Sequence, residues 1–480
     1  MVATCFPLNR LVPRPVAGHL PNWRAIALLL YNPPVRQSKR VPKVFAMTAS
    51  LNEPFDVLIV GGGPAGSTVA TLLARRGERV LLLEKEHHPR FHIGESLLPM
   101  NLPLFEELGV ADQIAQIGIP KYGVELVSPW HDKPSTLDFA QGWDKRFASA
   151  YEVRRSEFDH VLLKNAAAAG AEVIEGCRVN AVDFPSGGGV VARTTGDDGQ
   201  DRQYEAKFLV DASGRDTLLA TKFATKTSNR RHHSAAVYGH FTGARRLPGK
   251  AAGNISLFWF DHGWFWFIPL LDGTTSVGAV CHADFIKTRK TDVTSFFKGV
   301  IAMSPALADR LRDAELTGPA TATGNYSYKS NRISGPGYIM VGDAYGFIDP
   351  VFSSGVLLAM KGGFLAADAV TACLHRPAAE AERVLRRYQA DVDRAMVRFS
   401  WFIYRVNRPG LRALFMRHGN PLRLREAVLS LLSGDVFRPS PIHARLLLFK
   451  VLYYLKGVAA NWSRPSTGTA SGPAVKSGGA

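Results

Sequence analysis

The stretch FDVLIVGGGPAGSTVATLLAR, residues 55–75, decides the fold of this chain. Its first six residues form a short apolar run typical of a buried strand, and they lead directly into a glycine-rich turn and a helical stretch that ends near Arg76. A second strand-like run follows at 79–84 and ends in Glu84. Strand, G-x-G-x-x-G turn, helix, strand and acid in this order predict a βαβ unit that binds a dinucleotide.

Each glycine of this fingerprint has its own physical task. Gly61 permits the tight turn, Gly63 lets the backbone approach a pyrophosphate, and Gly66 lets the helix pack on the sheet. The amides at the helix N-terminus then face the phosphate charge. Glu84 is placed to accept hydrogen bonds from ribose hydroxyls, which favours a binding site over a mere glycine-rich turn.

Composition and charge describe an ordinary globular chain with an unusual beginning. Its 480 residues, 46% hydrophobic and 21% charged, leave room for two or three domain-sized cores. The net charge of +17 would suit a nucleic-acid partner, but seven basic residues lie in 1–50, which contains no acidic residue. We therefore expect no nucleic-acid partner. We expect 1–50 to be a disordered extension, either a transit peptide or the product of a start codon upstream of Met47, and 463–480 to be a disordered tail.

Cysteine usage predicts a reducing compartment. The four cysteines show no C-x-x-C pair and no histidine at metal spacing, so neither a disulfide framework nor a metal site is predicted. They are Cys5, Cys177, Cys281 and Cys373. We expect a cytoplasmic protein, with organelle targeting by 1–46 left open. No apolar run reaches 18 residues, so no transmembrane segment is predicted.

A second informative stretch is WFWFIP, residues 264–269, which lies between two turns. Its composition predicts a strand. The two-residue period of a strand places Trp264, Trp266 and Ile268 on one face and the two phenylalanines on the other. Taken alone, such a strand is simply part of a core.

Four other segments are informative when they are taken together. IGESLLP occupies 93–99, and a strand-like run followed by DASGR occupies 208–215. The run YIMVGDA at 338–344 ends in Gly-Asp ahead of another helical stretch. The loop FIDPVFSSGV at 347–356 places Ser-Ser-Gly before an apolar run of helical character.

With these segments in place, the chain resembles the flavin-dependent halogenases over about residues 54–460. The run 264–269 is similar to the W-x-W-x-I-P signature of that family, and 93–99 is similar to its I-G-E-S-x-x-P motif, which lies against the flavin. The Gly-Asp pair of 338–344 resembles the motif with which flavoprotein monooxygenases, reductases and halogenases hold FAD. The loop 347–356 looks like the loop that carries the halide in these enzymes.

The resemblance implies an α/β fold with FAD as cofactor. This is the Rossmann-like fold of the GR2 class of flavoproteins, the type of p-hydroxybenzoate hydroxylase. The FAD-binding domain is expected at 54–363, with an interleaved antiparallel substrate sheet formed by about 120–150 and 230–330. A helical C-terminal region is expected at 364–462.

The resemblance also implies the residues of three sites. The expected FAD site comprises Gly61, Gly63, Ala65, Gly66, Glu84, Gly94, Glu95, Ser96, Arg155, Asp343, Gly355 and Val356. The expected halide site, for chloride or bromide, comprises Ser353, Ser354 and Gly355. The expected lining of the substrate tunnel comprises Trp264, Trp266, Ile268, Pro269, Pro350 and Phe352.

Simpler roles remain open for two of these groups. A halide needs only converging N–H dipoles, which a helix start supplies. However, Ser353 or Ser354 could act only as a helix N-cap, and Glu95 and Ser96 could cap the helix that follows them.

Lys121 is the expected catalytic residue. In the halogenases a lysine in a segment similar to 119–127 ends a tunnel from the flavin, although a single lysine before a strand is usually a solvated surface residue. The resemblance implies that reduced flavin and oxygen give a C4a-hydroperoxide, which converts the halide to hypohalous acid. Lys121 would then orient this oxidant by hydrogen bonding, or be halogenated itself, beside an electron-rich aromatic substrate.

One departure from the family narrows the expected substrate. Indole-specific members carry a glutamate just before the hydroxyl-Gly pair of the halide loop, whereas this chain has no carboxylate in 352–355. This favours the branch that halogenates phenols or pyrroles, either free or tethered to a carrier protein. Interleaved arginines in 405–417 are where an acidic carrier would dock.

The expected partner is a separate flavin reductase, since no second nucleotide fingerprint is present for a nicotinamide cofactor. The first alternative is a flavoprotein hydroxylase or a geranylgeranyl-reductase-like C=C reductase, which would share the FAD residues but need neither halide nor Lys121. The second is a non-catalytic flavin-binding module. The sequence leaves open the arene, the ring position, the halide preference and the oligomeric state.

Overall fold

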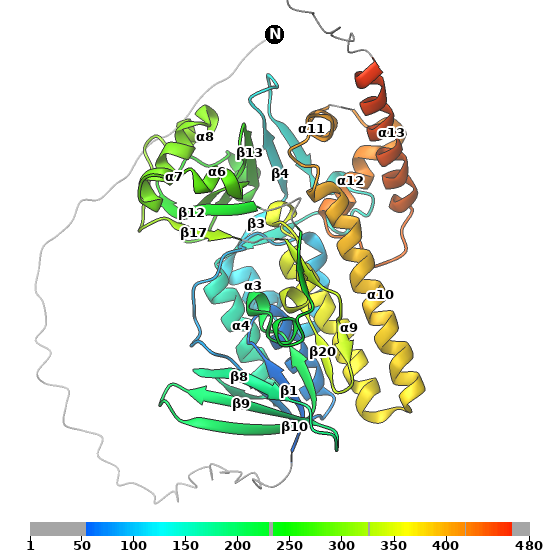
Figure 1. Ribbon diagram of the computed structural model, residues 1–480. Helices are drawn as coiled ribbons and strands as arrows, with labels where there is room; N and C mark the ends of the chain where they lie inside the picture. Colours follow the sequence, from blue (N-terminus) through cyan, green and yellow to red (C-terminus); the bar gives the residue numbers. More distant parts are fainter. Residues whose placement is uncertain (1–53, 230–233, 325–326, 418, 463–480) are drawn as a thin grey trace, which may run out of the picture. The chain divides into compact units, whose positions relative to one another are not determined.

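The computed structural model describes residues 54–229, 234–324, 327–417 and 419–462 (Figure 1). The predicted N-terminal extension and the predicted tail at 463–480 lie outside these residues, and so does Cys5. The three described cysteines are free thiols.

The first large sheet contains the dinucleotide-binding unit. Its strands run in the order β19-β20-β10-β1-β2-β7, and β20, β10, β1, β2 and β7 are parallel, while β8 and β9 extend β10 as an antiparallel ribbon. The strands are β1 (Phe55–Val60), β2 (Val80–Leu83), β7 (Glu172–Ile174), β8 (Cys177–Asp183), β9 (Val190–Gly196), β10 (Asp201–Asp211), β19 (Ser334–Gly335) and β20 (Tyr338–Met340). The helices beside it are α1 (Pro64–Arg75), α2 (Leu102–Leu108), α3 (Ala111–Ile117), α4 (Arg155–Ala168) and α5 (Leu218–Lys222).

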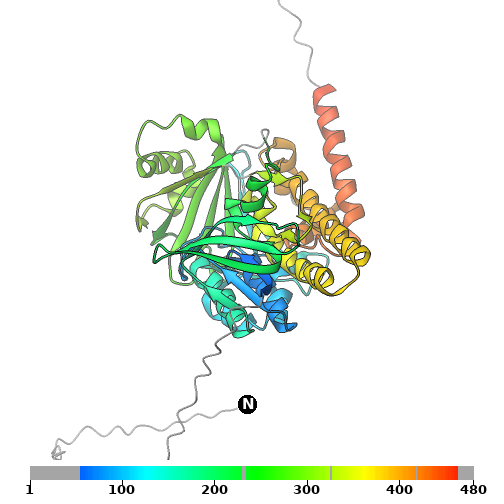
Figure 2. The same cartoon turned by 60° about the horizontal axis from the view of Figure 1, so that its bottom comes forward.

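The second large sheet has the order β16-β12-β15-β14-β13-β4-β5, with β17 also paired to β12. All its pairings are antiparallel except that of β13 with β4. The strands are β4 (Gly123–Val127), β5 (Ser135–Asp138), β12 (Ser234–Thr242), β13 (Ile255–Phe260), β14 (Gly263–Pro269), β15 (Thr275–His282), β16 (Glu315–Leu316) and β17 (Thr321–Gly324). The helices α6 (Ala283–Lys287), α7 (Val293–Ala302) and α8 (Pro305–Arg310) lie on its outer face in both views (Figures 1 and 2).

Two smaller sheets join these parts. β3 (Gly118–Lys121) pairs with β6 (Ala150–Val153), and β11 (Lys226–Ser228), β18 (Tyr328–Ser330) and β21 (Gly346–Phe347) form the other. The C-terminal helices are α9 (Gly355–His375), α10 (Ala378–Ile403), α11 (Pro409–Met416), α12 (Leu424–Leu432) and α13 (Ile442–Trp462). The mixture of a parallel sheet, an interleaved antiparallel sheet and a helical C-terminus confirms the predicted fold class.

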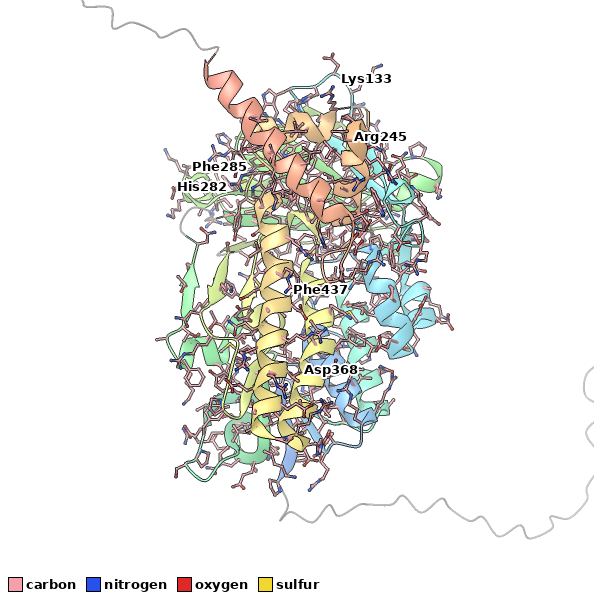
Figure 3. The ribbon with its side chains drawn as sticks, turned by 90° about the vertical axis from the view of Figure 1, so that its right-hand side faces the viewer. Lys133, Arg245, His282, Phe285, Asp368 and Phe437 are labelled. Atoms are coloured by element: carbon pink, nitrogen blue, oxygen red, sulfur yellow. The ribbon has the colours of Figure 1, made fainter. Side chains whose placement is uncertain are left out.

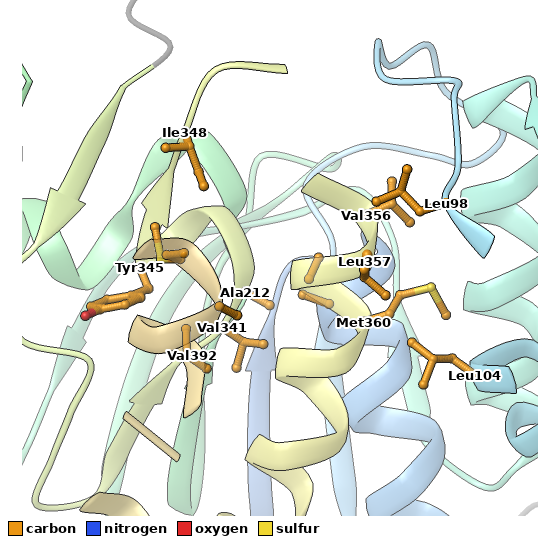
Figure 4. Packing of buried hydrophobic residues seen from close by; sticks show 14 of the residues in the cluster. Leu98, Leu104, Ala212, Val341, Tyr345, Ile348, Val356, Leu357, Met360 and Val392 are labelled. Carbon is orange, nitrogen blue, oxygen red and sulfur yellow. The ribbon is translucent and has the colours of Figure 1, made fainter. Parts of the chain in front are cut away.

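Helix α9 is packed into the core along most of its length. Figure 4 shows Leu357 and Met360 of α9 turned toward Leu104, while Val341 lies on the opposite side of the helix. Gly363 comes so close to α1 that a Cβ there would lie 3.0 Å from the Thr68 side chain. The predicted boundary at 363/364 therefore falls inside a continuous helix, and the predicted domain limits remain a prediction.

By length and composition α9 could also cross a membrane, and 67% of its most apolar window is buried within the protein. It packs between α1 and α10, and at its outer side Asp368 forms an ion pair of 2.7 Å with Arg76 (Figure 3). These contacts are those of a core helix.

Strand β14 is buried on both faces, which explains its unusual composition. Trp264, Trp266 and Ile268 belong to the main core, whereas Phe265 and Phe267 belong to a second core beneath α7 and α8. The predicted two-residue alternation is thus confirmed.

The backbone opposite Trp266 must be glycine. Gly278 of β15 pairs with Trp266 in the sheet, and a Cβ at Gly278 would lie 2.2 Å from the Trp266 ring. We expect Gly278→Ala to lower the free energy of unfolding by about 1–3 kcal/mol through overpacking, as measured by urea denaturation. Gly299→Ala on α7 is the matched control, since a Cβ there meets no atom within 4 Å, and it should raise stability by up to about 1 kcal/mol. Equal stability of the two variants would contradict this account.

Candidate active site

A cavity of about 950 Å³ is lined by residues of both large sheets. All the predicted FAD residues except Gly66 line it. Gly66 lies instead beneath the turn, where a Cβ would come within 1.9 Å of the Gly61 carbonyl oxygen. The cavity therefore collects residues that are nearly 300 positions apart in the chain, from Gly61 to Val356.

The turn after β1 leaves room for a diphosphate. Gly61 has φ +103°, and a Cβ there would collide with the Ala212 carbonyl oxygen at 2.4 Å. A Cβ at Gly63 would meet only the Arg90 guanidinium, at 3.7 Å, and both residues line the large cavity. The Arg90 guanidinium and the amides at the N-terminus of α1 are both suited to bind a pyrophosphate. Sequence analysis did not single out Arg90, whose only signal was its position soon after β2.

Glu84 sits at the end of β2, at the edge of the same cavity. One of its carboxylate oxygens accepts a hydrogen bond from the Gly62 N–H at 2.6 Å, and the other accepts one from the Glu86 N–H at 2.9 Å. The backbone thus fixes the carboxylate in place, and its remaining lone pairs are available to ribose hydroxyls.

Two buried carboxyl groups, those of Asp343 and Glu95, line the large cavity. Burial raises the pKa of Asp343 to about 6, and the positive charges of Arg155 and Arg215 partly offset this effect. Glu95 Oε1 lies 2.6 Å from His240 Nε2, while Glu95 Oε2 has no hydrogen-bond donor among the described residues. An orphaned buried oxygen is costly unless a ligand donates to it, which fits a cofactor with N–H and hydroxyl groups.

The predicted halide loop forms a short turn before α9. Ser353 takes up left-handed backbone angles, with φ +55°, and Ser354 occupies the N-cap position of α9 without a side-chain capping hydrogen bond. The alternative of a purely capping serine therefore lacks its hydrogen bond. A Cβ at Gly355 would meet only the Phe347 ring, at 3.7 Å. Ser353 and Gly355 line the large cavity, whereas Ser354 is buried behind them.

A second, small cavity of about 30 Å³ lies beside the first. Ile255, Val351 and Ser353 line both cavities, so they form the wall between them. Among the predicted tunnel residues, Trp264, Trp266, Ile268 and Pro350 line the large cavity and Phe352 lines the small one; Pro269 lines neither.

Lys121 lines the small cavity and is 1% exposed, so it is not the solvated surface lysine of the simpler interpretation. Its Nζ donates hydrogen bonds to Ser96 Oγ at 2.7 Å and to the Leu97 carbonyl oxygen at 3.0 Å. Glu152 Oε1 lies 3.7 Å from Nζ. Burial lowers the pKa of Lys121, and the Glu152 carboxylate acts in the opposite direction.

Sequence analysis missed two polar groups near Lys121. Glu152 is fully buried on β6, and Trp259 lines the small cavity with an indole N–H that has no acceptor in the described part of the chain. The available signal for Glu152 was a single carboxylate inside the apolar strand 150–153.

The βαβ unit, the glycine turn beside Arg90 and the acid at the end of β2 together define a dinucleotide-binding protein. The family follows from comparison with known proteins. The tryptophan halogenase family model matches residues 56–143 and 131–407. The chain belongs to this family, and it is an oxidoreductase of the flavin-dependent halogenase class.

Individual relatives agree with this assignment. The chain is 38% identical over 321 residues to a tryptophan 2-halogenase of Chondromyces crocatus, a match that covers 65% of this chain and 60% of that protein. It is 30% identical over 411 residues to a 1H-pyrrole-2-carbonyl peptidyl-carrier-protein chlorinase of Pseudomonas fluorescens, covering 80% and 90%. The structure of a myxobacterial chondrochloren halogenase, a variant of the FAD-dependent halogenases, superposes with a TM-score of 0.70 at 33% identity, covering 81% and 92%.

The Glu84 carboxylate is predicted to hold the FAD ribose, so its removal should weaken FAD binding. We expect Glu84→Ala to raise the Kd of the apoprotein for FAD about 10- to 100-fold, since a hydrogen bond to a charged group contributes roughly 1.5–3 kcal/mol. Fluorescence titration measures this change, and the Tm of each apoprotein checks that the turn has survived the loss of the Gly62 contact. Glu107→Ala, on the exposed surface of α2, should bind FAD like the wild type.

Stability should depend on pH through Glu152. Burial raises its pKa to about 8 against the lowering effect of Lys121, whereas the ordinary value is 4.5. At a pH between 4.5 and about 8, Glu152 keeps its proton in the folded protein but has lost it in the unfolded chain. The free energy of unfolding therefore falls as pH rises, by up to about 1.4 kcal/mol per pH unit.

We therefore expect the Tm of Glu152→Gln to decline less than that of the wild type from about pH 5 to about pH 8, measured by thermal denaturation. Glu172→Gln, at an exposed position on β7, is the control and should follow the wild type. Parallel Tm curves for Glu152→Gln and the wild type would refute the assignment.

Proposed function

We propose that this enzyme is an FADH₂-dependent halogenase that makes hypohalous acid from chloride or bromide and delivers it through Lys121 to an electron-rich aromatic substrate. The observation that carries this proposal is the position of Lys121. It is a buried amine in a small cavity whose wall toward the FAD cavity contains residues of the predicted halide loop, Val351 and Ser353.

Bound reduced FAD, together with oxygen, supplies the oxidising equivalent that converts halide to hypohalous acid. The protein holds the halide at the start of α9, where the Ser354 side chain does not cap the N–H groups of the first turn and where Gly355 lines the large cavity. Such converging amide dipoles stabilise an anion without a covalent partner.

The tryptophans of β14 exclude water from the place where the halide is oxidised. Trp264 is 3% and Trp266 is 5% exposed, and both line the large cavity. Trp266 is held in place by a hydrogen bond from its indole N–H to Ser276 Oγ at 3.1 Å. Excluding water protects a reactive oxidant from competing hydrolysis.

The lining of the small cavity favours an aromatic substrate, and we propose that this substrate is a phenol or a pyrrole. Apart from Lys121, Ser353 and Trp259 its lining is apolar. The indole N–H of Trp259 lacks an acceptor among the described residues, so a phenolic oxygen or a carbonyl of the substrate could accept from it. A volume of about 30 Å³ holds roughly one water, so side chains such as Phe352 and Phe415, whose rings are 6.2 Å apart, must move when an arene binds.

Two of the relatives bear on this substrate in different ways. One is a chlorinase of a carrier-bound pyrrole and the other is a tryptophan halogenase. The absence of a carboxylate from 352–355 favours the first type of substrate here, either free or tethered to a carrier. Electrons would come from a separate flavin reductase. The unpaired thiols of the three described cysteines suit a reducing compartment such as the cytoplasm.

Substitution of Lys121 tests the proposal directly. The assay combines the FAD-loaded enzyme, a flavin reductase, NADH, oxygen, and chloride or bromide with a panel of phenols, pyrroles and indoles, and detects products by mass spectrometry. We expect Lys121→Met to lower the yield of halogenated product about 100-fold or more, because it removes the group that delivers the oxidant. Its FAD content and oxygen consumption should remain those of the wild type.

The matched control is Lys133→Met, at a surface lysine (Figure 3), which should halogenate normally. Full product from Lys121→Met would refute delivery through this residue. Hydroxylated product formed without halide, or reduction of a C=C bond, would support the hydroxylase or reductase alternative instead.

A further inference from the structure

Glu152 is the buried acidic group closest to the proposed catalytic lysine. It lies on β6, which pairs with β3 so that Ile119 is opposite Glu152 and Lys121 is opposite Ala150. Its side chain is fully buried, and neither carboxylate oxygen has a hydrogen-bond partner among the described residues. A carboxyl group buried so deep is costly unless a neighbouring group of opposite charge compensates it, and Lys121 is such a group.

The geometry couples this carboxyl group to Lys121. Glu152 Oε1 lies 3.7 Å from Lys121 Nζ. Two of the three donors of the ammonium are directed to Ser96 Oγ and to the Leu97 carbonyl. Ser96 forms a β-bridge with Glu152, so the hydroxyl that accepts from Nζ belongs to the strand partner of Glu152. A proton can therefore pass between nitrogen and carboxylate after a small movement, without contact with solvent.

Few other charged groups act on this pair. Glu95 raises the pKa of Glu152, and Glu95 is itself paired with His240 of β12 at 2.6 Å. Burial is the main influence on both members of the pair, raising the pKa of Glu152 and lowering that of Lys121. Both shifts favour the uncharged forms, so the carboxyl is a suitable acceptor for the proton of its neighbour.

We propose that Glu152 is a positioning residue that accepts the proton of the Lys121 ammonium and returns it during halogen transfer. This inference rests on the proposed function. Proton transfer from Nζ to the Glu152 carboxylate leaves a neutral amine and a carboxylic acid. The amine displaces water from hypohalous acid, forming an N–halogen bond and releasing one water. The aromatic ring then takes the halogen. As the N–halogen bond breaks, the nitrogen takes the proton of Glu152. The nitrogen then takes the proton lost by the ring, which restores the Lys121 ammonium and the Glu152 carboxylate.

The absence of a carboxylate from positions 352–355 gives Glu152 added weight. Among the residues that line the small cavity, Lys121 is the one ionisable group, and the nearest carboxylate reaches it from β6, behind the lysine. Glu152 therefore does not touch the substrate. It acts through the state of Lys121.

The first test measures how the oxidant is divided between substrate and solution. The halogenation assay with a flavin reductase, NADH, oxygen and halide is run with a soluble β-diketone that traps escaped hypohalous acid. The ratio of halogenated substrate to halogenated trap is recorded against pH. In the wild type we expect this ratio to rise with pH through about 8, where the carboxyl becomes able to accept a proton. In Glu152→Gln the ratio should be about tenfold lower or less, without this rise.

Glu152→Asp keeps a carboxyl group one methylene shorter, and we expect it to restore the pH-dependent rise, at least in part. A purely structural role of Glu152 would lower the ratio equally at every pH and would not distinguish Gln from Asp. A Glu152→Gln enzyme with the ratio and pH profile of the wild type would overturn the proposal.

The second test needs no turnover. Protein labelled with ¹³C at the lysine ε-carbon is titrated by NMR, and Lys121 is assigned by the signal missing from Lys121→Met. We expect the titration midpoint of Lys121 to fall by about one pH unit or more in Glu152→Gln, because the neighbouring carboxylate no longer favours the ammonium. An unchanged midpoint would overturn the coupling.

The two tests separate the inference from the function on which it rests. If the wild type gives neither halogenated substrate nor halogenated trap, the proposed function fails, and the role of Glu152 in halogen transfer fails with it. The NMR midpoint then still decides whether the two groups share a proton. If the wild type halogenates and Glu152→Gln behaves identically in both tests, only the inference fails.

Discussion

A buried ammonium is the constraint on which the site depends. Removing an amine from water is costly, and the cost is offset only when hydrogen bonds and a neighbouring carboxyl group replace the lost hydration. For Lys121 those replacements come from Ser96 and Leu97 in one segment and from Glu152 in another. The Ser96–Glu152 bridge and the pairing of β3 with β6 bring both segments beside the lysine, so its position depends on both pairings.

Local patterns in the sequence were sufficient for the elements whose chemistry is local. The glycine turn at 61–66 needs backbone angles and close approaches that only glycine provides, and WFWFIP carries its alternation in six consecutive residues. The parallel sheet, the antiparallel sheet and the helical C-terminus follow the predicted fold class. The resemblance to a known family added the expected site residues, most of which the structure gathers around one cavity.

Other features could not be predicted because they depend on contacts between distant segments. The pattern around Lys121 indicates a surface residue, but the amine is buried against Ser96, Leu97 and the Phe139 ring, which its local sequence does not show. Glycine at 362 and 363 disfavours a helix by intrinsic propensity, yet α9 continues through both because Gly363 packs against Thr68 of α1. Arg90 and Trp259 had no motif that would have identified them.

The wall formed by Ile255, Val351 and Ser353 has a consequence for how such an enzyme can diversify. These three residues separate the large cavity, lined by most of the predicted FAD residues, from the small cavity, lined by Lys121 and Phe352. Substitutions on the Phe352 side can reshape the second compartment without touching the first. The surroundings of Lys121 can therefore change by mutation while the residues that line only the large cavity are kept.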